Sequence, residues 1–475
     1  MTGKDAPSAP EVSEARARAS GGSGGDGGGL RAEASRGPRL GRRHVLVGLA
    51  GGGLALGCPM GAGAAQAPQS NPATDAPDGT GRGASRQPFH GLHQSGIVTP
   101  RPASGLMVAF DVVATSPADL ETLLRRLTER IAFLTTGGPV ETRDPRLPPV
   151  DSGLLGPVVA PDDLTVTVSL GASLFENRPW LGGLAPRRLT RMEAFPNDAL
   201  EAGLCHGDLA LQFCANLQDT NIHALRDILK SMPEFLVPRW MQEGSVPVVA
   251  HAPGAPKESA RNFLGFRDGS ANPDAGDEAL MDRVVWVGEG AGEPGWATGG
   301  SYQAVRIIRN FVERWDRTPL REQQRIFGRQ KDSGAPLDGR TEADLPDYAA
   351  DPEGAVTPLA SHIRRANPRT AEAARHLILR RPFNYSNGVT RSGQLDQGLL
   401  FIAYQADLEA GFISVQRALD GEPLEEYIKP VGGGYFYVLP GVRDSGDWLG
   451  RSLIDAVKQS QAQPSPTPGS HTQEG

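Results

Sequence analysis

The sequence predicts an α+β fold made of two halves, each a β-α-β-β-α-β sheet with helices on one face. Two observations support this prediction. Strand-like apolar runs alternate with amphipathic helical stretches along most of the chain, and the order of these elements in the first half returns in the second. The length of 475 residues, 39% of them hydrophobic, suits a globular protein of one large or two medium domains.

The first half is assigned to residues 101–250 and begins with a strand-like run over residues 106–113. A Ser-Pro pair at 116–117 then opens an amphipathic helix, because serine and proline are typical of helix starts. The apolar face of that helix is formed by Leu120, Leu123, Leu124, Leu127 and Ile131. Residues 164–170 and 209–215 are predicted strands. The next helix carries Ile222, Leu225 and Leu229 on one face.

The second half, residues 251–457, repeats this order. It contains a predicted strand at 304–308, a helical stretch at 320–327 and a further strand at 399–405. A shift of 190 positions places the last strand and helix of the first half on those of the second. With this shift, the apolar helix face of the first half, Ile222, Leu225 and Leu229, coincides with Phe412, Val415 and Leu419 in the second. This similarity of pattern indicates that the two halves have the same arrangement of strands and helices.

The remaining segments of the chain are predicted to lack regular structure. Residues 235–300 and 328–360 are expected to be loop-rich connections, and loops on a rigid scaffold often carry the chemistry. Residues 68–100 are rich in Pro, Ser and Gly and are predicted to be a flexible linker. The last segment, 458–475, is predicted to be a disordered tail.

Residues 1–67 have the features of an export signal. A Gly-, Ala- and Ser-rich start that we expect to be disordered precedes Arg42 and Arg43, and a short glycine-diluted apolar stretch follows. Twin arginines in this position are typical of the Tat export route, and cleavage is expected after Ala67. The protein is therefore predicted to be exported to the periplasm, the cell envelope or the medium. A lipid anchor at Cys58 is disfavoured because the preceding leucine is one place off the lipidation motif.

Charge and cysteine content exclude several classes of protein. The net charge is −7 and no block of basic residues suggests a nucleic-acid partner. Removing residues 1–67 takes away eight basic and five acidic residues, which leaves the rest at −10. Cys205 and Cys214 show no metal-type spacing, and buried free thiols are expected, with a disulfide between them as the alternative. The nine histidines form no HExxH or HxH motif, which argues against a zinc site of several ligands.

A site with a single histidine ligand is still open, because a haem needs only one strong protein ligand for its iron. Three segments contain residues suited to such a site. Residues 262–273 combine an Asp-Gly pair with a dense set of Gly, Asn and Pro, which is typical of a tightly specified loop. Residues 361–369 place His362 beside several arginines. The apolar run before Arg380 favours a strand that delivers this arginine into an interior.

Together these segments resemble the dye-decolourising (DyP-type) peroxidase family, most closely its deferrochelatase/peroxidase (EfeB-type) branch. The resemblance covers residues 100–455. It rests on GFRDG at 265–269, SHIRRANPR at 361–369, CHGDLALQFCAN at 205–216, SGQLDQGLLFIAYQ at 392–405 and IKPVGGGYFYVLPGV at 428–442. It implies two ferredoxin-like halves forming a DyP-type peroxidase fold, with one haem b per chain.

The resemblance also implies roles for individual residues. His362 matches the proximal ligand of the haem iron, and Asp268 and Arg380 match the catalytic residues on the distal side. The positions that match haem-lining residues are Gly269, Ser270, Ala271, Asn367, Pro368, Arg369 and Arg380. The family pairs its proximal histidine with a downstream carboxylate, for which Glu425 and Glu426 are the candidates. Pro382 departs from branches that carry an asparagine there, which puts a distal role for this position in doubt.

The function implied is a haem peroxidase that uses hydrogen peroxide to oxidise bulky organic donors such as dyes, phenolics or porphyrinogens. Electron relay to such donors through Trp286, Trp296 or Trp315 is one interpretation of these residues, and a place in the core is the other. The alternative function is a deferrochelatase that releases iron from haem and leaves the porphyrin intact. A second alternative, an exported haem carrier, has no need for Asp268 with Arg380. We expect a homo-oligomer, in its simplest form a dimer, and partners among iron-uptake proteins of the envelope.

Overall fold

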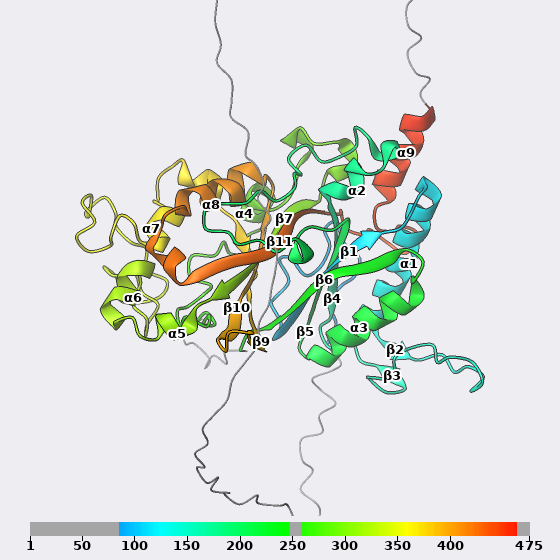
Figure 1. Ribbon diagram of the computed structural model, residues 1–475. Helices are drawn as coiled ribbons and strands as arrows, with labels where there is room; N and C mark the ends of the chain where they lie inside the picture. Colours follow the sequence, from blue (N-terminus) through cyan, green and yellow to red (C-terminus); the bar gives the residue numbers. More distant parts are fainter. Residues whose placement is uncertain (1–84, 248–257, 463–475) are drawn as a thin grey trace, which may run out of the picture. The chain divides into compact units, whose positions relative to one another are not determined.

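The computed structural model describes residues 85–247 and 258–462 (Figure 1). The strands are β1 Ser104–Val112, β2 Gly138–Pro139, β3 Val158–Val159, β4 Thr165–Gly171, β5 Leu209–Ala215, β6 Leu236–Ser245, β7 Ser301–Asn310, β8 Leu379–Arg380, β9 Phe383–Val389, β10 Leu395–Gln405 and β11 Ile428–Val438. The α-helices are α1 Pro117–Thr136, α2 Ala172–Glu176, α3 Gln218–Ser231, α4 Glu278–Val284, α5 Val312–Trp315, α6 Leu320–Phe327, α7 His362–Ala366, α8 Ser414–Leu419 and α9 Arg451–Ala462. The predicted leader, with its twin arginines and Cys58, lies outside the described residues.

The two halves have the same strand order, as the recurrence of sequence pattern predicts. In the first half the order is β6-β1-β5-β4, and in the second it is β11-β7-β10-β9, with antiparallel neighbours throughout. The halves join where β11 pairs with β4 and where Ser245 of β6 pairs with Asn384 of β9. The strand pairings therefore form a closed ring. The edge strands of each half, which would otherwise be unpaired, hydrogen-bond to strands of the other half. The α+β prediction is confirmed.

Local sequence explains why the first helix begins and ends where it does. The hydroxyl of Ser116 accepts a hydrogen bond from the backbone N–H of Asp119, and the Asp119 carboxylate accepts one from the backbone N–H of Ser116. This reciprocal pair is a capping box, and Pro117 supplies the preset first turn. The helix ends at Gly137, whose φ of 72° favours glycine.

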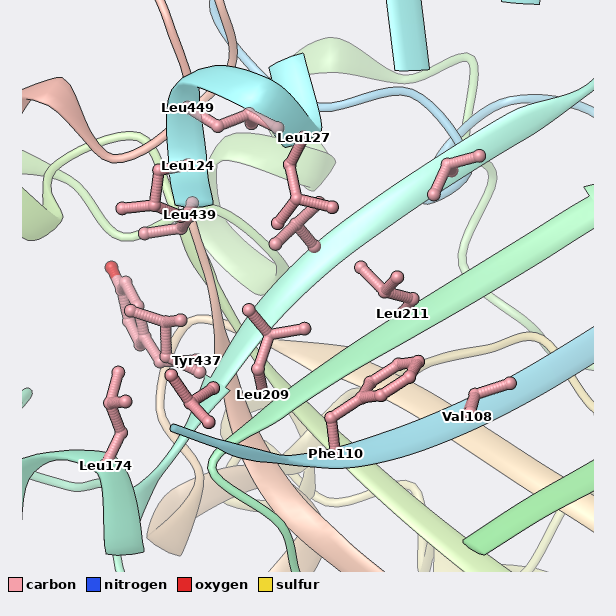
Figure 2. Packing of buried hydrophobic residues seen from close by; sticks show 14 of the residues in the cluster. Val108, Phe110, Leu124, Leu127, Leu174, Leu209, Leu211, Tyr437, Leu439 and Leu449 are labelled. Atoms are coloured by element: carbon pink, nitrogen blue, oxygen red, sulfur yellow. The ribbon is translucent and has the colours of Figure 1, made fainter. Parts of the chain in front are cut away.

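The alternation of side chains along β1 distributes its residues between two cores. Val108 and Phe110 are buried with leucines of α1 and β5 in the core between the sheet and its helices (Figure 2). Met107 and Ala109 point the other way and pack with residues of the second half, such as Ile402. Both faces of this strand are thus buried, which explains why it is apolar along almost its whole length.

Three segments differ from the sequence prediction. Residues 235–300 contain β6 and α4, although they were expected to be loop-rich. The linker predicted for 68–100 is folded from residue 85 onward where the structure describes it: the Gln94 side chain is buried and its amide donates to Val168 and Leu439 carbonyls at 2.8 Å. Residues 458–462, which were assigned to the predicted tail, belong to α9, and the rest of that segment lies outside the described residues.

Other predictions concern single residues. Cys205 and Cys214 are free and buried. Trp286, Trp296 and Trp315 are also buried, so they have the core positions that were one of the two interpretations. Within the described ranges, the structure contains no helix that is both long and apolar enough to cross a membrane.

Leucine truncation will test the core between sheet and helices. Replacing the fully buried Leu211 of β5 by alanine should lower the free energy of unfolding by about 2–5 kcal/mol, because it removes apolar contacts and leaves a cavity. Leu217, which is 59% exposed, provides the matched control, and its alanine variant should change stability by less than about 0.5 kcal/mol. Urea denaturation measures both. Equal losses for the two variants would contradict the assigned packing.

Candidate functional site

The candidate site is a cavity on the outward face of the second half. Its floor is formed by side chains of β7 and β10, such as Ile308, Leu399 and Phe401. Helix α8 and the π-helical turn before it, η7 Glu409–Ile413, contribute Phe412, Val415 and Leu419. The helix face that was predicted from sequence as a packing surface therefore borders the cavity. Its walls are largely apolar, with several polar residues set among them.

His362, the first residue of α7, lines this cavity and is held by a buried carboxylate. Its Nδ1 lies 2.8 Å and 3.0 Å from the two oxygens of Glu422, whose side chain is only 3% exposed. Burial lowers the pKa of His362, but the charge and hydrogen bond of Glu422 outweigh it, and the pKa is raised. With Nδ1–H donating to Glu422, Nε2 is the nitrogen left to act as a ligand.

The identity of this carboxylate corrects the sequence prediction, which named Glu425 or Glu426. A short 3-10 helix, η8 Pro423–Glu426, follows Glu422 and contains the two later glutamates, which have other hydrogen-bond or charge partners. The Glu425 carboxylate accepts the backbone N–H of Gly421 at 2.9 Å. The Glu426 side chain is 62% exposed and faces Arg314. Glu422 immediately precedes the helix, and it alone of these three contacts His362.

Asp268 and Arg380 meet at the same cavity, although 112 positions separate them. The Arg380 Nη1 donates to Asp268 Oδ1 at 3.0 Å, and its Nη2 donates to the Ser270 carbonyl at 3.0 Å. The second Asp268 oxygen accepts the side-chain amide of Asn262 at 3.3 Å. Both side chains are partly exposed, at 27% for Arg380 and 14% for Asp268. The pair is thus fixed in geometry and still accessible from the cavity.

The backbone of Arg380 is also fixed by the loop that carries Asp268. The Asn272 side chain accepts the Arg380 N–H at 2.9 Å and donates to the Arg380 carbonyl at 3.0 Å. Ala271, just before it, has a φ of 60°, a conformation that non-glycine residues seldom adopt. Strain of this kind clusters at functional sites.

Further cations border the cavity beside Arg380. Arg329 is buried, and burial lowers its pKa, with nearby Arg369 and Arg380 acting in the same direction. Arg369 is exposed and has a φ of 59°. Burial would raise the pKa of Glu342, but hydrogen bonds from Ser259 and Ser270 outweigh it and lower that pKa. The three arginines outnumber this one carboxylate, so this part of the cavity favours anionic groups.

The structure brings most of the sequence-predicted residues to the cavity. Lining residues among them are Asp268, Ser270, Ala271, His362, Asn367, Arg369 and Arg380. Gly269 and Pro368 lie outside the lining. Pro382 is also outside it, and its carbonyl accepts a hydrogen bond from Arg101 at 2.5 Å. Burial is the main cause that lowers the pKa of Arg101, and the charge of Asp268 opposes this shift.

Sequence reasoning missed Asn262, Asn272, Arg101 and Glu422. Both asparagines lie inside the motif-bearing loop, so their place in the sequence was a usable signal. Arg101 and Glu422 had no such signal, because each reaches its partner across a large sequence separation. Among residues 85–247 and 258–462, no three His, Cys, Asp or Glu side chains gather in a way that could hold a metal ion.

Comparison with known proteins assigns the family. Residues 94–245 match the model of the Dyp-type peroxidase N-terminal domain, and residues 259–443 match that of the C-terminal domain. The chain belongs to the DyP-type peroxidase family. The resemblance found in the sequence is confirmed, and the boundary between the two matches agrees with the two halves of the sheet.

Individual relatives support this assignment. The chain is 56% identical over 414 residues to a protein named deferrochelatase from Escherichia coli K12, covering 87% of this chain and 96% of the relative. The deferrochelatase of Shigella flexneri shows the same identity and coverage. Among solved structures, a DyP-type peroxidase from Cellulomonas bogoriensis aligns with a TM-score of 0.69 at 37% identity, covering 79% of this chain and 99% of that one. Ferric DtpA from Streptomyces lividans aligns with a TM-score of 0.70 at 34% identity, covering 80% of this chain and 100% of that one.

Proposed function

We propose that this chain is a haem peroxidase that holds one haem b per chain and uses hydrogen peroxide to oxidise bulky organic donors. The observation that carries the proposal is the presence, on one cavity, of a carboxylate-held histidine and a separate aspartate–arginine pair. Family membership supports the same chemistry. A haem carrier without enzymatic activity would need His362 alone, so the fixed distance between Asp268 and Arg380 favours an enzyme.

The residues of the cavity fit a haem by their chemistry. His362 offers one imidazole nitrogen, because the other is engaged by Glu422. The apolar floor around Ile308 and Phe401 suits a porphyrin ring, and the cationic side near Arg329 and Arg369 suits its carboxylates. Asn367 and Ala271 border the same space. When bound, the haem would supply an iron through which electrons pass from the organic donor to peroxide.

The residues of this chain would then move the protons and hold the charge. Asp268 accepts a proton from one peroxide oxygen and returns it to the other as the O–O bond breaks. Its Oδ2 is the better placed atom for this proton, because Oδ1 is held by the charged Arg380 at 3.0 Å and Oδ2 only by the longer hydrogen bond from Asn262, at 3.3 Å. The Arg380 guanidinium stabilises the negative charge that develops on the departing oxygen, and its fixed position avoids reorganisation. Glu422 keeps the His362 ring oriented with Nε2 toward the cavity.

Removal of the proposed ligand tests haem binding. The variant His362→Ala should lose the Soret band after purification, because no other side chain in the proposal supplies a nitrogen to the iron. The exposed His90 is the matched control, and His90→Ala should keep one haem per chain. Absorption spectra with haem quantification decide the question. Unchanged haem content in His362→Ala would exclude His362 as the ligand.

Removal of the proposed base tests the peroxide step. The variant Asp268→Asn should react with hydrogen peroxide roughly 10²- to 10⁴-fold more slowly, because the amide cannot accept the proton. Haem content should stay the same, since Asp268 is not the ligand. Stopped-flow absorption measures the reaction, and Asp282→Asn, an exposed aspartate on α4, is the control. A wild-type rate in Asp268→Asn would overturn the role of this residue.

Release of iron from haem is the second candidate function, favoured by the 56% identity to proteins named deferrochelatase. The two functions use the same cavity and differ in their products. Purified protein should be given haem with and without hydrogen peroxide, while the Soret band and free protoporphyrin are followed. Protoporphyrin formed without peroxide consumption favours iron release. Peroxide-dependent oxidation of an added dye without protoporphyrin favours the peroxidase, and His362→Ala controls for spontaneous loss.

We also propose that the protein is exported by the Tat route to the periplasm, envelope or medium, without a lipid anchor at Cys58. The support is the twin arginine followed by a short apolar stretch and a small-residue cleavage site. Cell fractionation of a variant with Arg42→Lys and Arg43→Lys should find the protein retained inside, and unchanged export would contradict the proposal. We propose further that the protein forms a homodimer, which light scattering would detect, and that it contacts iron-uptake proteins.

A further inference from the structure

The position of Arg380 depends on few contacts of its own strand. Strand β8 contains only two residues, Leu379 and Arg380, and pairs with β10 along one edge. In a β-strand the N–H and C=O of one residue point to the same side, and the next residue points to the other. The N–H of Arg381 donates to Ile402 of β10 at 2.7 Å, so the Arg380 groups face away from that strand.

Asn272 forms hydrogen bonds with the edge of β8 that does not pair with β10. Its Oδ1 accepts the Arg380 N–H at 2.9 Å and its Nδ2 donates to the Arg380 carbonyl at 3.0 Å. One side chain thus satisfies both backbone groups in the manner of a neighbouring strand. Without it, two partly buried polar groups would lose their partners, and such groups tend to move until they find new ones.

The same loop also determines where the arginine side chain ends. The Asp268 carboxylate accepts a hydrogen bond from Arg380 Nη1, and the Ser270 carbonyl accepts one from Arg380 Nη2, each at 3.0 Å. The loop is itself held, because Asp268 N–H donates to the Ala260 carbonyl at 2.9 Å and Asn272 N–H donates to Gly269 at 3.1 Å. Three residues of this loop therefore contact Arg380: Asp268 and Ser270 at its guanidinium, and Asn272 at its backbone.

We propose that Asn272 is a positioning residue that sets where the Arg380 guanidinium lies relative to Asp268. It acts through Arg380 and does not itself touch the reacting atoms. This inference rests on the proposed function, because it takes Arg380 to be the group that stabilises charge on the peroxide. Ala271, the residue before Asn272, has a φ of 60°, a conformation that non-glycine residues seldom adopt.

A double-mutant cycle tests the inference. Asn272→Ala and Arg380→Ala are made singly and together, and each haem-loaded protein is measured by its rate with hydrogen peroxide and by its affinity for fluoride. Fluoride serves as the probe because an anion at the site would accept a hydrogen bond from Arg380. Asn272→Ala should slow the peroxide reaction by about 10- to 100-fold and weaken fluoride binding, since small misplacements of a catalytic group have effects of this size. In the Arg380→Ala background it should have almost no further effect.

Each outcome of the cycle supports or overturns the inference. Equal effects of Asn272→Ala in both backgrounds would show a general structural role and overturn it, as would wild-type values in the single variant. A wild-type peroxide rate in Arg380→Ala would instead refute the proposed role of Arg380. Asn272→Asp, which keeps the acceptor and loses the donor, should lie between wild type and alanine, and it replaces Asn272→Ala in the cycle if that variant does not hold haem. Asn216→Ala, which removes a partly buried side-chain hydrogen bond to Asp163 in the first half, controls for lost stability.

Discussion

Strand β7 is hydrogen-bonded along both edges, to β10 and to β11, so its side chains alternate strictly between two environments. Val305 and Ile307 point into the core shared by the two halves, and Arg306 and Ile308 point to the cavity. A shift of one residue in this register would exchange the two sets. The cavity floor, and with it the distance from floor to His362 and Arg380, depends on this register.

The corresponding face of the first half is covered differently. There α1 and α3 pack on the sheet, and Leu124 and Phe110 belong to one hydrophobic core (Figure 2). In the second half the covering helices are short, and loops carry most of the polar groups that reach the cavity. Figure 1 shows this contrast between the long α1 and α3 and the short α5 to α8. The same strand order thus supports packing in one half and chemistry in the other.

The polar groups of the site are organised in advance of any ligand. Arg380 is fixed by hydrogen bonds at its guanidinium and at its backbone, and His362 by a carboxylate that is almost fully buried. Partial exposure to solvent limits what the ion pair between Asp268 and Arg380 adds to stability. Its value lies in orientation, because groups that are already in place need no reorganisation when charge develops.

Sequence patterns predicted the strands and helices whose periodicity reflects burial, such as β1, α1 and β10. They failed at β6, because much of this strand is exposed and polar and Pro238 interrupts it. His362, Asp268 and Arg380 were found because each lies in a distinctive local motif. Glu422 was not, since its contact with His362 spans 60 positions and neighbouring glutamates have the same local pattern. Only the turn made by η8 distinguishes it from them.

The cavity also has a thermodynamic consequence. A bound ligand would cover the apolar floor of the cavity as core residues cover a sheet. Part of the apolar surface of the second half is therefore removed from water only when the ligand binds. A ligand that binds the folded chain alone raises its stability by an amount that grows with the logarithm of ligand concentration. Because the two halves share a core and pair at both edges, this stabilisation would extend to the whole folded unit. The cofactor would therefore act as a further piece of the core, and the folded fraction of the chain would depend on the concentration of cofactor.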